Sequence, residues 1–101
     1  MQFFLKKTMI VGILEVSLHI PAANSLKMKR KVIVSLKERM KRQFNISLSE
    51  TDGQNTWQRC TLACAMVAVQ RQAVEREFQH ILDLIDAESS VCITDQWMDF
   101  F

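Results

Sequence analysis

The sequence predicts one α+β domain of the ferredoxin-like class, in which two helices cover one face of a four-stranded antiparallel sheet. The length predicts a single domain, because 101 residues with 49% apolar and 24% charged side chains suffice for one hydrophobic core. Two Gly and one Pro supply too few turns for a sandwich of many short strands. Hydrophobic periodicity follows the order β-α-β-β-α-β. Two right-handed β-α-β units joined by a hairpin form the ferredoxin-like arrangement of two helices on a four-stranded sheet. We expect the domain over residues 9–101, after an N-terminal extension over residues 1–8.

The first half of the domain predicts a strand followed by a long helix. Residues 9–20 alternate apolar and polar side chains, as a strand with one buried face does, and Pro21 ends this strand. The helix is expected over residues 25–44, with Asn24 or Ser25 as its N-cap. Its apolar residues recur at intervals of 7, 3, 4 and 4 and form one stripe, made of Leu26, Ile33, Leu36, Met40 and Phe44.

The second half predicts a hairpin, a second helix and a last strand. Residues 45–50 alternate Ile or Leu with Ser, and residues 51–55 contain an Asp-Gly step that is typical of a hairpin turn. A long strand over residues 57–69 follows, with much of both faces covered. An amphipathic helix is expected over residues 71–87 and a final strand over residues 91–97.

This topology also predicts which segments meet in space. The first and third strands are central, and the start of the first strand lies beside the end of the fourth. We therefore expect one cluster of aromatic side chains from the two ends of the chain, made of Phe3, Phe4, Trp97, Phe100 and Phe101.

The charges are divided unevenly along the chain. Residues 1–43 hold ten Lys and Arg but two acids, whereas residues 44–101 hold three Lys and Arg but nine acids. The overall net charge of +2 therefore hides a net +8 in the first part and a net −6 in the second. Asymmetry of this kind indicates an anionic partner such as a nucleic acid.

Eight of the thirteen basic residues lie in the predicted first helix, and most of them share one side of it. Like charges four residues apart, such as Lys27 and Lys31, cost about 0.2–0.5 kcal/mol, and cations near the helix start oppose the macrodipole. Bound phosphates would relieve both penalties. The candidate phosphate contacts in this helix are Lys27, Lys29, Arg30, Lys31, Lys37, Lys41 and Arg42.

Two residues beyond the hairpin turn extend this hypothesis. Trp57 could stack on a base and Arg59 could hold a phosphate, although a packed Trp beside a solvated Arg explains the same pair. The basic helix face could likewise be only a solvated surface, neutralised by the acids of the second helix: Glu75, Glu77, Asp83, Asp86 and Glu88. Both interpretations stay open from the sequence.

The sequence favours a protein that is not an enzyme. Glu15, Ser17 and His19 share one strand face, but nothing supplies a nucleophile elbow or an oxyanion hole. Three Cys without a CxxC motif predict neither a disulfide framework nor a zinc site, and they suit a reducing cytoplasm. No cofactor motif appears, and no apolar run reaches the roughly 20 residues that a membrane span needs. We therefore expect no catalytic residue, no metal, no small-molecule cofactor and no membrane contact.

Several separated motifs carry a family resemblance. They are the first strand with its glycine, the Pro before SLKMKR at residues 25–30, the QFN triplet at residues 43–45 and the WQR triplet at residues 57–59. With these motifs, residues 9–95 resemble the YlxP-like family of small bacterial proteins, a domain of unknown function. Met9 stands where such proteins usually begin. The stretch TDGQN lacks a His that the family often carries there.

The resemblance implies a ferredoxin-like fold, no established catalytic activity, and gene neighbourhoods that hold translation initiation and ribosome-maturation factors. Together with the basic helix, it leads to the expectation of a cytoplasmic accessory protein that contacts ribosomal RNA, the ribosome or another structured RNA. The alternative is a protein-interaction module or a homodimer without nucleic acid. Such a module would act through the open sheet face or through residues 45–50 as an edge strand.

Overall fold

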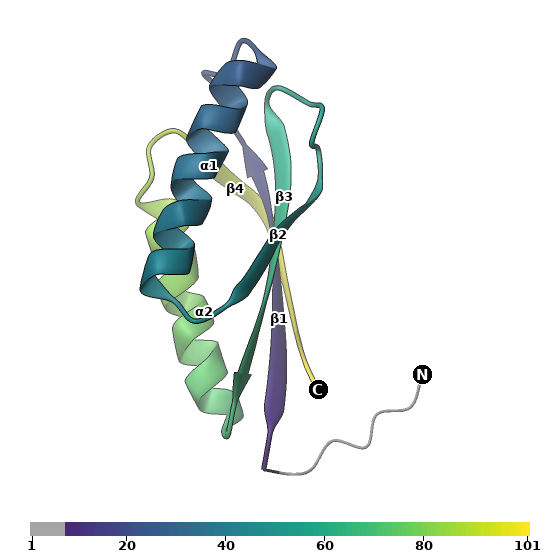
Figure 1. Cartoon of the computed structure of the whole chain (residues 1–101), viewed down its shortest axis with the longest axis vertical. Helices are drawn as coiled ribbons and strands as arrows, with labels where there is room; N and C mark the ends of the chain where they lie inside the picture. The colour runs from purple at the N-terminus through teal and green to yellow at the C-terminus, as the bar shows by residue number, and fades with distance from the viewer. Residues whose placement is uncertain (1–7) are drawn as a thin grey trace.

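The computed structural model describes residues 8–101 and confirms the predicted fold class and element order (Figure 1). Both helices lie on the same side of the sheet, so the sheet has one covered face and one open face. The elements are β1 (Ile10–His19), α1 (Leu26–Gln43), β2 (Ser47–Asp52), β3 (Arg59–Ala68), α2 (Arg71–Asp86) and β4 (Cys92–Phe100). The antiparallel sheet has the order β2-β3-β1-β4, so β1 and β3 are central as predicted.

The hydrophobic core lies between the sheet and the two helices. β1 alternates buried and exposed side chains along its length, with Leu14, Val16 and Leu18 facing the helices. α2 contributes Phe78 and Ile81, which are fully buried. The strand β3 is covered less evenly than predicted, because its helix-facing residues are buried while small residues on the open side stay partly exposed.

Gly12 allows α2 to lie close against β1. A Cβ atom on Gly12 would stand 2.3 Å from Cγ1 of Val74 and 3.0 Å from the ring of Phe78, and both of these side chains are buried. The missing Cβ of Gly12 therefore sets how closely the second helix packs against β1. Between residues 8 and 101, neither helix is long and apolar enough to cross a membrane.

The start of β1 lies beside the end of β4 as predicted, but the aromatic side chains do not form one cluster. Val11 and Phe101 exchange backbone hydrogen bonds of 3.0 and 2.8 Å, and this pairing extends β4 beyond its predicted end. Phe100 faces the helices, where its ring lies 6.3 Å from that of Phe78, whereas Trp97 is opposite Glu15 on the open face. The predicted contributions of Phe3 and Phe4 lie outside the described residues.

Candidate nucleic-acid interface

The helix α1 begins at a well-formed cap and turns its charged side to solvent. Ser25 accepts a hydrogen bond of 3.1 Å from the backbone N–H of Met28, which satisfies one of the free donors of the first turn. No acid stands in that first turn, so no carboxylate there balances the cations near the positive end of the helix. The apolar stripe is buried through Ile33, Leu36 and Met40.

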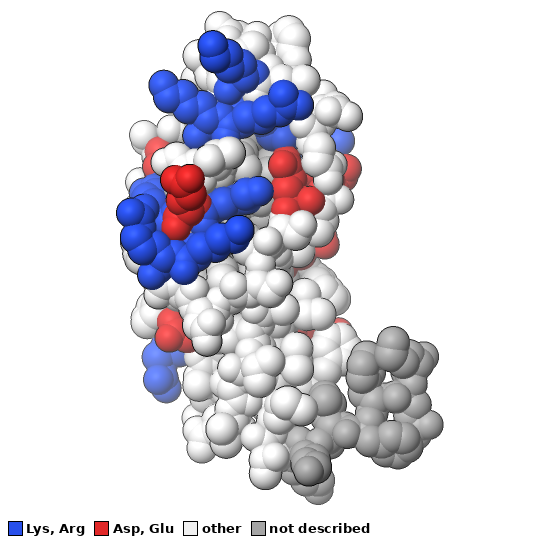
Figure 2. Space-filling view, viewed as in Figure 1, with Lys and Arg blue, Asp and Glu red and all other residues white. Residues whose placement is uncertain are grey.

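Six cations of α1 form one surface, which we call the basic ridge. They line the solvent side of the helix over about 22 Å, given the rise of about 1.5 Å per residue. All are exposed except Lys37, which is half-buried, and the set is Lys27, Arg30, Lys31, Lys37, Lys41 and Arg42. Figure 2 shows Lys and Arg side chains gathered over α1 around one acidic side chain, while the lower part of the same face carries few charges. Exposed Val34 and the acid Glu38 lie among these cations and line a shallow hollow with Lys27, Arg30 and Lys31.

The basic ridge is not neutralised by the second helix. Within residues 8–101, none of its six cations forms an ion pair. Among the acids of α2 and the residues that follow it, only Glu88 reaches α1, through a 2.6 Å contact with Arg39. The acids Glu75 and Glu77 instead face Arg71 and His80 of their own helix. Among the cations of α1, only Arg39 is therefore neutralised in the way that the alternative interpretation predicted.

Lys29 does not belong to the basic ridge, which corrects its predicted role as a phosphate contact. Its side chain is 1% exposed, and its Nζ donates hydrogen bonds to Oε2 of Glu50 at 2.6 Å and to the backbone oxygen of Gly53 at 2.7 Å. The position of Lys29 in the sequence already indicated that it would be buried. Lys29 divides the interval of seven residues between Leu26 and Ile33 into three and four, which places it within the apolar stripe.

The buried ammonium group joins a small polar cluster beneath the hairpin. Burial raises the pKa of Glu50, but hydrogen bonds from Lys29 and Cys60 and the charge of Lys29 outweigh it, so this pKa lies below its usual value. Burial, followed by the hydrogen bond to Glu50, raises the pKa of the Cys60 thiol to about 12. Cys60 is therefore a protonated thiol that supports the carboxylate and is a poor nucleophile.

The hairpin between β2 and β3 lies against the start of α1. Gly53 adopts a φ of 82°, and a Cβ there would stand 2.7 Å from the backbone oxygen of Arg59, so the turn requires glycine. The side chain of Gln58 donates hydrogen bonds of 3.2 and 3.1 Å to the backbone oxygens of Pro21 and Ala23. Gln58 thus ties the hairpin to the loop before α1. Sequence reasoning missed this role, although Gln58 stands within the WQR triplet of the family resemblance.

The structure separates the two hairpin residues that were predicted to contact nucleic acid. Trp57 is 53% exposed in the hairpin loop, at the end of the molecule where α1 begins (Figure 1). Arg59 is opposite His19 in the sheet and therefore lies on the open face, away from the helices. Its guanidinium pairs with Asp52 at 3.2 Å. The hairpin loop that carries Trp57 is therefore held beside the start of α1, whereas Arg59 points away from the helices.

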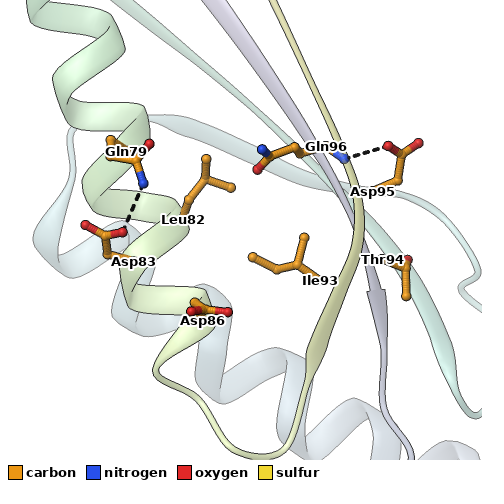
Figure 3. A pocket seen from close by; sticks show the side chains of 8 residues that line it. All are labelled: Gln79, Leu82, Asp83, Asp86, Ile93, Thr94, Asp95 and Gln96. Carbon is orange, nitrogen blue, oxygen red and sulfur yellow. Dashed lines mark hydrogen bonds between the residues drawn. The ribbon is translucent and has the colours of Figure 1, made fainter.

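An open pocket of about 420 Å³ between α2 and β4 is an alternative site. Figure 3 shows Leu82 and Ile93 pointing toward one another across it, whereas Asp95 lies on the other side of β4. Gln79 is already hydrogen-bonded to Asp83 at 3.0 Å. No group of three or more His, Cys, Asp or Glu between residues 8 and 101 could hold a metal ion. The pocket therefore offers neither converging ligands nor a nucleophile with a base.

The geometry defines a ferredoxin-like α+β domain that carries a cationic helix, and its fold is shared with proteins of unrelated sequence. A de novo designed protein, Foldit4, matches 92% of this chain and 96% of its own at 13% identity, with a TM-score of 0.51. A C-terminal segment of the alpha subunit of aIF2 from Pyrococcus abyssi matches 94% of this chain and 52% of its own at 11% identity, also with a TM-score of 0.51. At such identities these likenesses show the fold alone.

The family is shown by the sequence itself. The model of a family described as protein of unknown function, DUF503, matches residues 11–98. The uncharacterized protein YlxP of Bacillus subtilis (strain 168) is 38% identical over 78 residues, which cover 77% of this chain and 85% of that protein. The chain therefore belongs to the DUF503 family, and its predicted resemblance to YlxP-like proteins is confirmed.

Proposed function

We propose that this protein is a non-enzymatic accessory protein that binds structured RNA, such as ribosomal RNA, through phosphate contacts of the basic ridge. One observation carries the proposal: within residues 8–101 none of the six cations of the ridge forms an ion pair, although Glu38 lies among them and acids are plentiful on α2 and β4. Exposed cations in a row of this length match the regular charges of a nucleic-acid backbone, and they neutralise phosphates without reading the sequence.

The hairpin supplies a second kind of contact at one end of the ridge. Trp57 is exposed, and the bonds of Gln58 to the loop before α1 hold the hairpin beside the start of the helix. An unpaired base could stack on this ring while the ridge holds the flanking phosphates. The gene neighbourhoods implied by the family resemblance support ribosome maturation as the setting, in the cytoplasm.

We also propose that the protein does not catalyse a reaction. The thiols of Cys60 and Cys64 are buried, and burial raises the pKa of Cys64 to about 11, so neither is an activated nucleophile. Glu15, Ser17 and His19 lie along one strand of the open face, where the hydroxyl of Ser17 lies 3.5 Å from that of Thr61.

The test compares two charge reversals of equal size. Fluorescence anisotropy with a ribosomal RNA hairpin measures the affinity of the wild type, of K27E/K31E and of R59E/R76E. Each variant changes the net charge by the same amount, but only the first lies on the ridge, since Arg59 is on the open face and Arg76 on α2. We expect K27E/K31E to lose at least about 30-fold in affinity and the control to lose about 3-fold or less, because screened charges away from the contact act weakly.

The salt dependence checks the mechanism in the same experiment. If all six ridge cations displace counterions, the affinity of the wild type falls about 1,000-fold between 50 and 200 mM salt. The proposal is wrong if the wild type shows no RNA binding and no ribosome co-sedimentation in low salt. It is also wrong if the two double variants lose affinity equally.

A further inference from the structure

The cations of the basic ridge stand in two separate groups along α1. The first group is Lys27, Arg30 and Lys31, and the second is Lys37, Lys41 and Arg42. No charged residue lies between the groups, because residues 32–36 are Val, Ile, Val, Ser and Leu. The centres of the two groups are about 16 Å apart along the helix, at about 1.5 Å per residue. Figure 2 shows the same division, with uncharged surface between an upper and a lower group of Lys and Arg side chains.

An acid occupies the outermost line of the helix, at the edge of the gap between the two groups. With about 100° per residue, Glu38 points almost directly away from the buried side of α1, which includes Leu36 and Met40. Glu38 is exposed, and between residues 8 and 101 it forms no ion pair, although Arg42 stands one turn away. Exposed Val34 lines the same shallow hollow.

The two ends of the ridge match a phosphate backbone, but the middle of the ridge does not. The phosphates of a single strand follow one another at short intervals, so a strand along the whole ridge would place some of them over the gap and beside Glu38. Phosphate oxygens, like the oxygens of an ionised carboxylate, only accept hydrogen bonds, so the two would repel each other. A well-matched partner therefore presents phosphates at both groups and hydrogen-bond donors between them.

We propose that α1 lies across the minor groove of double-stranded RNA, where Glu38 accepts hydrogen bonds from ribose 2′-hydroxyl groups. This inference rests on the proposed function and names the kind of RNA that the ridge takes. The minor groove of an A-form duplex is wide and shallow, so an exposed helix can lie against it, and it displays 2′-hydroxyl groups that can donate to a carboxylate. The two groups of cations then hold phosphates of opposite strands, and Val34 lies over the groove between them.

The same arrangement favours RNA duplexes over DNA duplexes. DNA lacks the 2′-hydroxyl group, and its minor groove offers the carboxylate of Glu38 only the amino group of guanine as a donor. The major groove of duplex RNA is too deep and narrow for side chains to read. Glu38 is therefore a specificity-determining residue, while the cations on either side of it supply affinity.

The test compares three probes of the same sequence in low salt by fluorescence anisotropy. They are an RNA duplex of about 16 base pairs, the same duplex with its 2′-hydroxyl groups methylated, and one RNA strand alone. Methylation keeps every phosphate and removes the 2′ donors. We expect the wild type to bind the unmodified duplex at least about 10-fold more tightly than either of the other probes, because hydrogen bonds to a charged group are strong.

Glu38→Ala separates the recognition of ribose from the phosphate contacts. The loss of one acid raises the affinity for every polyanion, so the informative quantity is the ratio of the affinities for the two duplexes. We expect this ratio to fall to about 2-fold in Glu38→Ala, because no carboxylate is left to accept from the 2′-hydroxyl groups. It should stay at the wild-type value in Glu75→Ala, which removes an equal charge from the exposed surface of α2. Circular dichroism shows that each variant is folded.

The possible failures of the two proposals are distinguishable. If the wild type binds RNA through the ridge but binds both duplexes equally, the contact between Glu38 and ribose is overturned and the proposed function is retained. The same conclusion follows if the single strand binds as tightly as the duplex, or if Glu38→Ala keeps the wild-type ratio. If no RNA probe binds in low salt, the proposed function itself is wrong, and this inference fails with it.

Discussion

Lys29 shows how one buried charge supports the cationic helix without joining its exposed surface. Its ammonium group holds Glu50 of β2 and the backbone of Gly53 in the hairpin turn, so it fixes the hairpin against α1. Taking a charge out of water is costly, and here two strong acceptors at 2.6 and 2.7 Å offset that cost. The residue is therefore sensitive to replacement in a way that its exposed neighbours are not.

Replacing Lys29 should destabilise the protein. Lys29→Met keeps the length of the side chain but leaves Glu50 without its partner, so we expect the free energy of unfolding in urea to fall by about 3 kcal/mol at pH 7. The exposed control Lys31→Met should change it by about 0.5 kcal/mol or less. Equal effects from the two variants would show that Lys29 is not held as described.

The same pair predicts a pH dependence. Because the pKa of Glu50 is below its ordinary value of 4.5 in the folded chain, its contribution to stability is present above pH 4.5 and is lost as the pH falls through the lowered value. The difference in unfolding free energy between the wild type and Lys29→Met should therefore shrink below pH 4.5. A constant difference down to pH 3 would contradict this account.

The three cysteines should differ sharply in reactivity. Cys92 is exposed, whereas burial raises the pKa of Cys60 to about 12 and that of Cys64 to about 11. Iodoacetamide at pH 8 should therefore modify the native chain once within minutes and modify the other two thiols only after unfolding, as mass spectrometry would show. Cys92→Ser should remain unmodified while it is native; modification of that variant would mean that the buried thiols are accessible.

At the scale of elements, the contact between β1 and α2 depends on one missing methyl group. Gly12→Ala would place a Cβ atom 2.3 Å from Cγ1 of Val74, a stiff side chain that is fully buried. We expect a loss of about 2 kcal/mol in the unfolding free energy, as for other overpacked cores. In a double-mutant cycle, Val74→Ala should offset part of this loss. Additive losses would show that Gly12 does not act through Val74.

The same elements show what the sequence could and could not predict. Periodicity predicted both helices to within two residues at each end, because their apolar stripes are long and regular. The end of β4 was predicted too early, because pairing with β1 rather than local pattern extends it to Phe100. The ridge cations were found from their spacing. Arg59 was grouped with them only because it is near Trp57 in sequence, and the alternation of β3 sends it to the other face.

On the scale of the whole molecule, most acids lie away from the basic ridge. The ridge follows α1, while Asp83 and Asp86 of α2 line the pocket between α2 and β4, and Asp95 and Asp99 lie on the open side of β4. In the electric field of a polyanion, this separation turns α1 toward the polyanion and β4 away from it. It also explains how a chain with a net charge of only +2 can carry a strongly cationic surface.

Because both helices cover the same side of the sheet, the basic ridge and the open face look in opposite directions. An RNA bound along α1 would therefore leave the open face of the sheet accessible. A molecule bound to the open face would in turn not compete with RNA for the ridge.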